Sequence, residues 1–258
     1  MTTVKDILQF IEQLAPRRMK AQWDNVGLLC GSEIQPVKKI LVALDPFEHV
    51  CREAAEIGAD LLVTHHPLIF VAPNAITDDT SVGRSVMTLI RNNISAINAH
   101  TNLDCAHGGV NDVLAAKLGL TDTEVLLYDG SDFGLLRMGN VEEQSLADFA
   151  AKVKTALSCP GLRLVDGGRP VSKVAVGGGA CGDEVREAYD AGCDTFVTAD
   201  VKYNQFWDAK ELGINLIDAG HFHTENPIVA VLAEKLRASF PEITVEASKS
   251  HCDCVNFF

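Results

Sequence analysis

The chain has 258 residues, of which 47% are hydrophobic and 22% charged, a composition typical of a globular protein and not of a disordered one. Its 35 Asp and Glu residues outnumber its 22 Lys and Arg residues, so the formal net charge is −13. Because this excess repels phosphate backbones and anionic membranes, a general nucleic-acid-binding or membrane-binding function is disfavoured. A local cationic or metal site would still suit a phosphorylated small molecule.

The first 14 residues predict a short amphipathic helix and not a signal peptide, since apolar residues recur at helical spacing with charges between them. No stretch approaches the ~20 apolar residues of a membrane span. Eight scattered cysteines predict free thiols and a cytoplasmic protein. For the close pair Cys252 and Cys254, two thiols in a terminal strand or tail are favoured over a metal or redox role.

An internal repeat organises the chain, because residues 39–64 align without a gap on residues 173–198. Nine of the 26 aligned positions are identical, and each copy predicts a strand, a helix, a glycine at the helix end and a second strand. A further helix and strand follow each copy. The predicted strands are 40–44, 61–64, 94–99, 174–176, 195–198 and 214–219, and the predicted helices are 48–57, 85–92, 183–191 and 203–212.

Strands that alternate with helices predict an α/β fold, in which helices pack on mostly parallel or mixed sheets. We expect two pseudo-symmetric βαβ-type halves, residues 1–125 and 167–258, within a single compact domain over residues 1–258. The bridge 126–166 is too short to be an independent domain. It predicts a strand over 135–141, a helix over 146–157 with Ser145 as N-cap, and a strand over 162–165. The chain closes with a predicted helix over 228–240 and strand over 243–247.

Six of the eight histidines lie just after three of the predicted strands. They are His65, His66, His100, His107, His221 and His223. In open α/β folds, ligands bind beyond the carboxyl ends of the parallel strands. Because equivalent strands of the two halves carry these histidines, we expect one shared cleft.

Two spacings among these residues suit metal ligands. His65 and His66 can reach a common centre only where the strand has ended, and Pro67 favours a break there; a hydrogen-bonded turn is the alternative. His221 and Glu225 are four residues apart and share one face if a helix starts at Gly220. That pair alone is weak.

The candidate ligands form a set of nitrogen and oxygen donors without a thiolate, which favours zinc, iron or manganese. Asp104, after His100, joins the set, although an aspartate there could instead cap a helix or turn. The five candidates are His65, His66, Asp104, His221 and Glu225. Because a catalytic mononuclear zinc usually needs only three protein ligands, five candidates favour two divalent metal ions roughly 3.5–4 Å apart.

Six motifs occur in order along nearly the whole chain. They are Trp23-Asp-Asn-Val-Gly27-Leu28, His65-His66-Pro67, His100-x-x-x-Asp104, Val176-Gly-Gly-Gly179, Thr198-x-Asp200 and Gly220-His221-x-x-Thr224-Glu225. Together they resemble the GTP cyclohydrolase 1 type 2 homolog family, also called Ngg-interacting-factor-three-like. The resemblance implies a dinuclear metal site with the five ligands named above, and a ring-shaped homohexamer whose sites face an inner cavity.

The family name implies that a metal-bound hydroxide attacks C8 of the guanine ring of GTP, opening the ring and releasing formate. A divalent metal lowers the pKa of bound water from ~15.7 to ~7, which provides hydroxide at neutral pH. His100 is the candidate proton shuttle, or alternatively a residue that orients a metal ligand. Phosphoester hydrolysis suits the same site, and the alternative outside the enzymes is a metal-binding, regulatory hexameric scaffold.

Two further motifs have open interpretations. The glycines of Val176-Gly-Gly-Gly179 lie where a phosphate-binding turn would, but tight packing of that turn explains them equally. Trp23 could form the floor of a pocket, although a buried Trp beside a capping Asp24 is favoured. His107 and His223 are weaker candidates, because a helix would turn His223 away from the face of His221.

Overall fold

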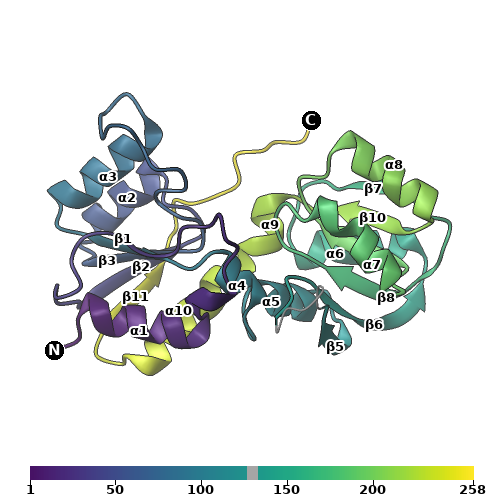
Figure 1. Ribbon diagram of the computed structural model, residues 1–258, viewed down its shortest axis with the longest axis horizontal. Coiled ribbons are helices and arrows are strands. Elements are labelled where there is room, and N and C mark those ends of the chain that lie inside the picture. Colours follow the sequence, from purple (N-terminus) through teal and green to yellow (C-terminus); the bar gives the residue numbers. More distant parts are fainter. Residues whose placement is uncertain (127–132) are drawn as a thin grey trace. The chain divides into compact units, whose positions relative to one another are not determined.

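The computed structural model describes residues 1–126 and 133–258 (Figure 1). These residues form two compact units, residues 1–106 with 228–252 and residues 107–227 with 253–258. The mixed α/β class predicted from the sequence is confirmed. The boundaries differ from the predicted halves, since the segment after Ala106 joins the second unit and the helix and strand after Pro227 join the first. Residues 127–132, near the start of the predicted bridge, lie outside the described residues, and the single domain stays a prediction.

The first unit is built on a five-stranded sheet, most of it parallel (Figure 1). Its strands, in order across the sheet, are β1 (Gly27–Cys30), β4 (Ser95–Asn98), β3 (Leu61–Thr64), β2 (Lys39–Ala43) and β11 (Thr244–Ala247). Only β1 runs antiparallel to its neighbour. Ala43 pairs with Thr64, and Thr64 with Asn98. The residues that follow β2, β3 and β4 therefore emerge at one edge of the sheet.

Helices cover both faces of this sheet because its strands are apolar on both sides. The helices are α2 (Glu48–Glu56) and α3 (Ser81–Arg91) on one face, and α1 (Val4–Leu14) and α10 (Pro227–Ser239) on the other (Figure 1). Leu41 and Ala43 pack in one core with residues of α2 and α3. Ile40 and Val42 point to the opposite face and are equally buried. The short η1 (Arg17–Met19) and α4 (Thr101–Cys105) complete the unit.

The second unit repeats the parallel centre and adds antiparallel strands at both edges. Its strands, in order across the sheet, are β5 (Thr121–Val125), β6 (Arg137–Gln144), β8 (Val171–Val176), β9 (Thr195–Thr198), β10 (Asn215–Asp218) and β7 (Arg163–Val165). Since β6 and β7 pair with β8 and β10, the predicted bridge contributes two strands to this sheet.

The helices of the second unit pack on both faces of its sheet, because successive residues of a strand point to opposite faces. They are α5 (Val110–Lys117), α6 (Leu146–Ala156), η2 (Gly182–Glu184), α7 (Val185–Asp190), α8 (Tyr203–Leu212) and α9 (His221–Glu225). Phe196 lies in one core with residues of α7 and α8, whereas the next residue, Val197, lies in another core with residues of α5 and α6. Ser145 caps α6 as predicted, because its side chain accepts a hydrogen bond from the backbone N–H of Asp148. Across the described residues, no helix has the length and hydrophobicity needed to cross a membrane.

Identical residues of the repeat perform the same structural tasks in both units. The carboxylate of Asp60 accepts a hydrogen bond from the backbone N–H of Lys39 at 3.0 Å, and Asp194 accepts one from Lys173 at 2.8 Å. The ammonium group of each lysine donates to a carbonyl at the C-terminal end of the helix that follows it, at 2.9 and 2.8 Å. Gly58 has a φ of +66°, the left-handed value that ends a helix at low cost. The two copies of the repeat therefore use equivalent hydrogen bonds to hold the strand and the helix together.

Candidate functional site

The first candidate ligand set begins where β3 ends. The hydroxyl of Thr64 donates to the carbonyl of His66 at 2.7 Å, which holds the chain in a turn. His65 is completely buried, and its Nδ1 donates to the carbonyl of Ala99 at 2.9 Å. Nδ1 of His66 donates to Asp45 at 2.6 Å. The ring centroids of His65 and His66 lie 4.8 Å apart, so the two side chains reach the same region, as expected if the strand ends before Pro67.

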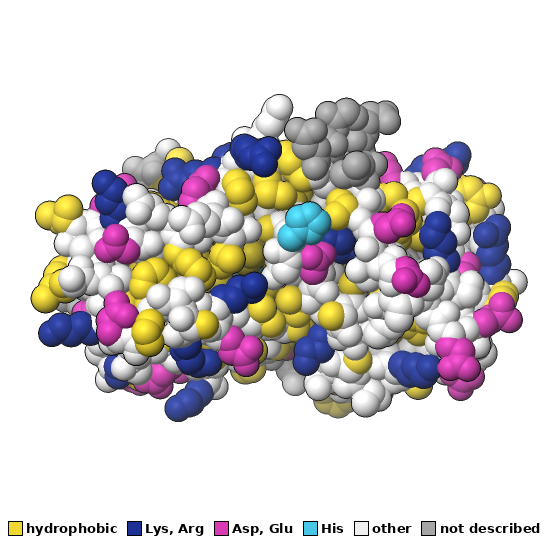
Figure 2. Space-filling view, turned by 90° about the horizontal axis from the view of Figure 1, so that it is seen from below, with side chains coloured by type: hydrophobic (Ala, Val, Ile, Leu, Met, Phe, Trp, Pro, Cys, Tyr) yellow, Lys and Arg dark blue, Asp and Glu magenta, His cyan; other side chains and the backbone are white. Residues whose placement is uncertain are grey.

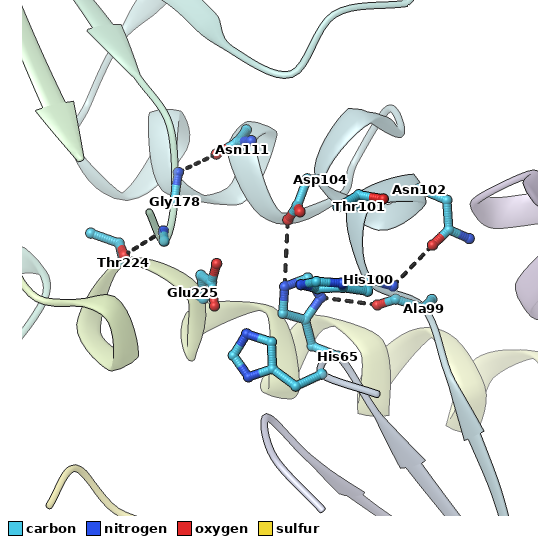
Figure 3. Close-up of polar contacts among 12 residues, drawn as sticks. His65, Ala99, His100, Thr101, Asn102, Asp104, Asn111, Gly178, Thr224 and Glu225 are labelled. Carbon is cyan, nitrogen blue, oxygen red and sulfur yellow. Dashed lines mark hydrogen bonds and ion pairs between the residues drawn. The ribbon is translucent and has the colours of Figure 1, made fainter. Parts of the chain in front are cut away.

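The next strand, β4, leads into α4, which supplies the rest of this set. His100 precedes α4, and Asp104 lies one turn further along it. Nε2 of His65 is 3.5 Å from Oδ1 of the buried Asp104 (Figure 3). His65, His66 and His100 each offer a ring nitrogen, and these atoms lie within 4.8 Å of one another. The structure therefore brings four predicted site residues together in the first unit.

Hydrogen bonds fix the orientation of the histidine rings in this set. A carbonyl oxygen can only accept a hydrogen bond, so Nδ1 of His65 carries a proton, and the ring is oriented with Nε2 towards Asp104. His100 donates from Nδ1 to Asp24 at 2.8 Å. Burial alone would raise the pKa of Asp24, but hydrogen bonds from His100 and Thr101 outweigh it and lower the pKa to about 2. Asp24 is therefore ionised at neutral pH and accepts the hydrogen bond from Nδ1 of His100.

The second set lies on α9, in the second unit. Nε2 of His221 and Oε2 of Glu225 are 3.0 Å apart, as their spacing of four residues predicts. Nδ1 of His221 donates to Asp200 at 2.7 Å. Burial lowers the pKa of His221, but hydrogen bonds to Asp200 and Glu225 raise it to about 11. The hydrogen bond from His221 in turn lowers the pKa of Asp200, which has a φ of +52°. Such a backbone, unusual outside glycine, is a common feature of functional sites.

The glycine-rich turn after β8 packs against this second set. A Cβ on Gly179 would lie 2.1 Å from Oε1 of Glu225 and 3.1 Å from Nε2 of His221. The backbone N–H groups of Gly178 and Gly179 donate to Asn111 and Thr224, at 2.7 and 3.0 Å (Figure 3). Because protein side chains already use these two groups, the packing interpretation of the turn holds and the phosphate-binding one does not.

Three other residues from the sequence analysis have different roles. His107 is exposed, and its Nδ1 lies 3.9 Å from Oδ2 of Asp112, so nothing connects it to either set in the structure as described. His223 pairs with Asp253 at 3.2 Å. The expectation of a buried Trp23 is wrong, since this side chain is 63% exposed. Its neighbour Asp24 is buried and accepts a hydrogen bond from the backbone N–H of Thr101 at the start of α4, as a capping residue does.

Sequence reasoning missed the residues that hold the ligands. Asp45 accepts from His66 and also from Nε2 of His251, at 2.9 Å. Burial would raise its pKa, but these two hydrogen bonds lower the pKa of Asp45 well below its usual range. The sequence did contain a signal for Asp45, because Asp45 follows the end of strand β2 just as His65 follows the end of strand β3. Nothing near His251 in the sequence indicates that it reaches back to Asp45.

The C-terminal residues line a pocket of about 340 Å³ next to His221 in the second unit. Phe257 forms part of its wall and packs where Gly161 lacks a side chain, since a Cβ there would lie 2.4 Å from the ring. Cys252 and Cys254 are exposed thiols in the same tail. On the face that Figure 2 shows, acidic and basic side chains are interspersed and form no large basic patch among the described residues.

Fold and side chains define an α/β protein with imidazole and carboxylate groups gathered at the carboxyl ends of parallel strands. The family model Duf34/NIF3 (NGG1p interacting factor 3) matches residues 2–253. The chain therefore belongs to the Duf34/NIF3 family, which confirms the resemblance noted in the sequence.

Individual relatives agree with this assignment. A GTP cyclohydrolase 1 type 2 homolog of Clostridium perfringens is 37% identical, over 91% of this chain and 91% of that protein. A protein of the same description from Clostridium acetobutylicum is 35% identical, over 94% and 92% of the two chains. Among solved structures, a Bacillus cereus protein related to NIF3 has a TM-score of 0.93 and 27% identity, over 100% of this chain and 99% of that one.

Proposed function

We propose that this protein is a dinuclear metal-dependent hydrolase that binds two divalent ions. The ligands are His65, His66, Asp104, His221 and Glu225. One observation carries the proposal: each of the three ligand histidines donates from Nδ1 to a carbonyl or a carboxylate. Histidines that bind metals characteristically have this second contact, which orients the ring and presents Nε2 to the ion.

The chemical types of the proposed ligands favour a divalent transition metal or zinc. Imidazole and carboxylate groups suit zinc, iron and manganese, and availability decides among them. The space around Gly179 supports the second set, because any other side chain there would occupy the position of the Glu225 carboxylate. Bound divalent ions would acidify a water molecule and polarise the substrate.

The chain itself supplies proton transfer through His100. Asp24 accepts a hydrogen bond from Nδ1 of His100, which orients the ring so that Nε2 can take a proton from water and return it to a leaving group. The ring centroid of His100 lies 5.2 Å from that of His65 and 5.4 Å from that of His66. His100 is therefore well placed to act beside the ions.

The substrate we propose is GTP: one water attacks C8 and opens the imidazole ring, and a second water hydrolyses the resulting N-formyl group and releases formate. This choice rests on the name of the relatives. Phosphoester hydrolysis is the second reaction to test, because two metals stabilise both the attacking and the leaving oxygen. We also propose a cytoplasmic homohexamer, on the strength of the resemblance, which the mass of the particle in solution would test.

Turnover by the metal-loaded protein tests the reaction. Protein loaded separately with zinc, manganese and ferrous iron is incubated with GTP and with p-nitrophenyl phosphate, and formate and phosphate release are measured. We expect formate from GTP, and loss of both metal and turnover in Glu225→Ala. Glu187→Ala, at an exposed position of the same unit, is the matched control. Metal binding without any turnover would instead support a regulatory scaffold.

A further inference from the structure

Two exposed aromatic side chains stand beside His100 in the first unit. Trp23 is 63% exposed and Phe70 is 51% exposed. Their ring centroids are 5.7 Å apart, and each lies about 6 Å from the ring of His100, at 6.2 and 6.1 Å. We call Trp23 and Phe70 the aromatic pair. Single exposed apolar residues are ordinary, whereas two in contact beside a candidate catalytic histidine form an apolar surface that is open to a ligand.

The backbone around the aromatic pair is held rigidly. Asp24, next to Trp23, bonds to His100 and to the backbone of Thr101. The side chain of Asn25 donates to the carbonyl of Ile69, the residue before Phe70, at 2.7 Å. Both loops are therefore locked to each other and to the start of α4. A surface built in advance loses little conformational entropy when a ligand binds.

We propose that the aromatic pair stacks the planar base of the substrate, which makes the substrate class a nucleoside or nucleotide. The inference rests on the proposed function in that it places the base beside the metal-binding histidines. Exposed aromatic faces bind bases by stacking, whatever the base, because every base has a π-face. An uncharged ring is also a ligand that the acidic protein does not repel, unlike a bare polyphosphate.

Tryptophan fluorescence tests the proposal directly, because the chain has only two tryptophans. Trp207, on α8 in the second unit, is replaced by phenylalanine, so Trp23 alone reports. We expect guanosine and GTP to quench this emission and inorganic triphosphate to leave it unchanged, because only the first two carry a base. Saturable binding of guanosine by calorimetry, without quenching, would overturn the proposal.

Affinity measurements on variants complete the test. Since stacking on one aromatic ring contributes substantially to binding, we expect Trp23→Ala to weaken guanosine binding about 5- to 100-fold and Trp23→Phe to restore most of it. Phe47→Ala is the control, because Phe47 is 50% exposed in the same unit but contacts His49 and His251 instead of His100. Unchanged affinity in Trp23→Ala, together with an altered particle mass, would show that another copy of the chain covers this surface and would refute the proposal.

The outcomes separate this inference from the proposed function. If GTP is hydrolysed and Trp23→Ala keeps the wild-type KM, the aromatic pair has no part in binding although the enzyme is confirmed. If guanosine quenches Trp23 but GTP is never hydrolysed, the base-binding surface stands without the named reaction. Metal content should be the same in Trp23→Ala and the parent protein, since neither aromatic residue is a proposed ligand.

Discussion

The candidate ligand His66 is held by a relay of two residues in the first unit. Its Nδ1 donates to one oxygen of Asp45, and the other oxygen accepts from Nε2 of His251 at 2.9 Å. The side chain of His251 is only 5% exposed, so water competes little for this contact. His251 therefore acts on the candidate metal site as a positioning residue, through Asp45.

Replacement of His251 by alanine should weaken metal retention without removing a ligand. Loss of a residue that orients a metal ligand typically costs 10–100-fold in affinity, and we expect an effect of about this size. Metal dissociation constants from competition with a chelator would measure it. His49→Ala is the matched control, because the ring of His49 lies 5.9 Å from that of His251 and is exposed. Equal losses in the two variants would contradict the relay.

Asp24 should make stability depend on pH in the acid range. Its pKa is about 2 in the folded protein, against 3.8 as a model value, a difference that corresponds to about 2 kcal/mol. Because the folded pKa is the lower one, this stabilisation is complete above pH 4 and is lost as the pH falls towards 2. Asp24→Asn should therefore be about 2 kcal/mol less stable at pH 7, with a gap that narrows below pH 4. Urea unfolding between pH 7 and pH 3 measures it, and a gap independent of pH would contradict the assignment.

Among the elements, the turn between β8 and η2 has the tightest contact with a candidate ligand. Gly179→Ala would force Glu225 aside, so we expect lower metal affinity as well as lower stability. Gly168→Ala is the matched control, because Gly168 also has a positive φ, of +81°, but nothing lies within 4 Å of its would-be Cβ. It should lose about 1 kcal/mol from backbone strain alone and keep its metal. Equal metal affinity in the two variants would refute the contact.

The elements that carry the repeat were predictable from local pattern. Strand β3 and helix α8 have the predicted bounds, since apolar runs and a glycine such as Gly213 delimit them. Strand β5 was missed because its residues are mostly exposed and polar, and α4 is too short to show a helical period. Helix 183–191 begins as η2 and continues as α7.

The part of the candidate site that directly follows the strand ends was predictable from the sequence. His65, His100 and His221 were found because each follows a parallel strand, a rule that needs no contact information. Their partners were not, because the pairing of Asp45 with His251 joins positions 206 residues apart. The exposure of Trp23 was also unpredictable, since a tryptophan usually gains by burial and only the surrounding contacts reveal an exception.

At the scale of the whole molecule, the chain passes between the two units next to the candidate ligands. One passage follows Ala106, two residues after Asp104, and another follows Pro227, two residues after Glu225. Each unit therefore carries part of the proposed ligand set close in sequence to a point where the chain leaves that unit. We propose that both sets bind metal: His65, His66 and Asp104 in the first unit, and His221 and Glu225 in the second.

Metal content per chain tests this claim most directly. Protein purified without added metal is compared with His65→Ala, with His221→Ala and with the double variant, at matched free metal concentrations. We predict about two metal ions per chain in the wild type, a lower metal content in each single variant and the lowest metal content in the double variant. Folded protein that takes up no metal would contradict the claim, and so would a metal content that neither substitution changes.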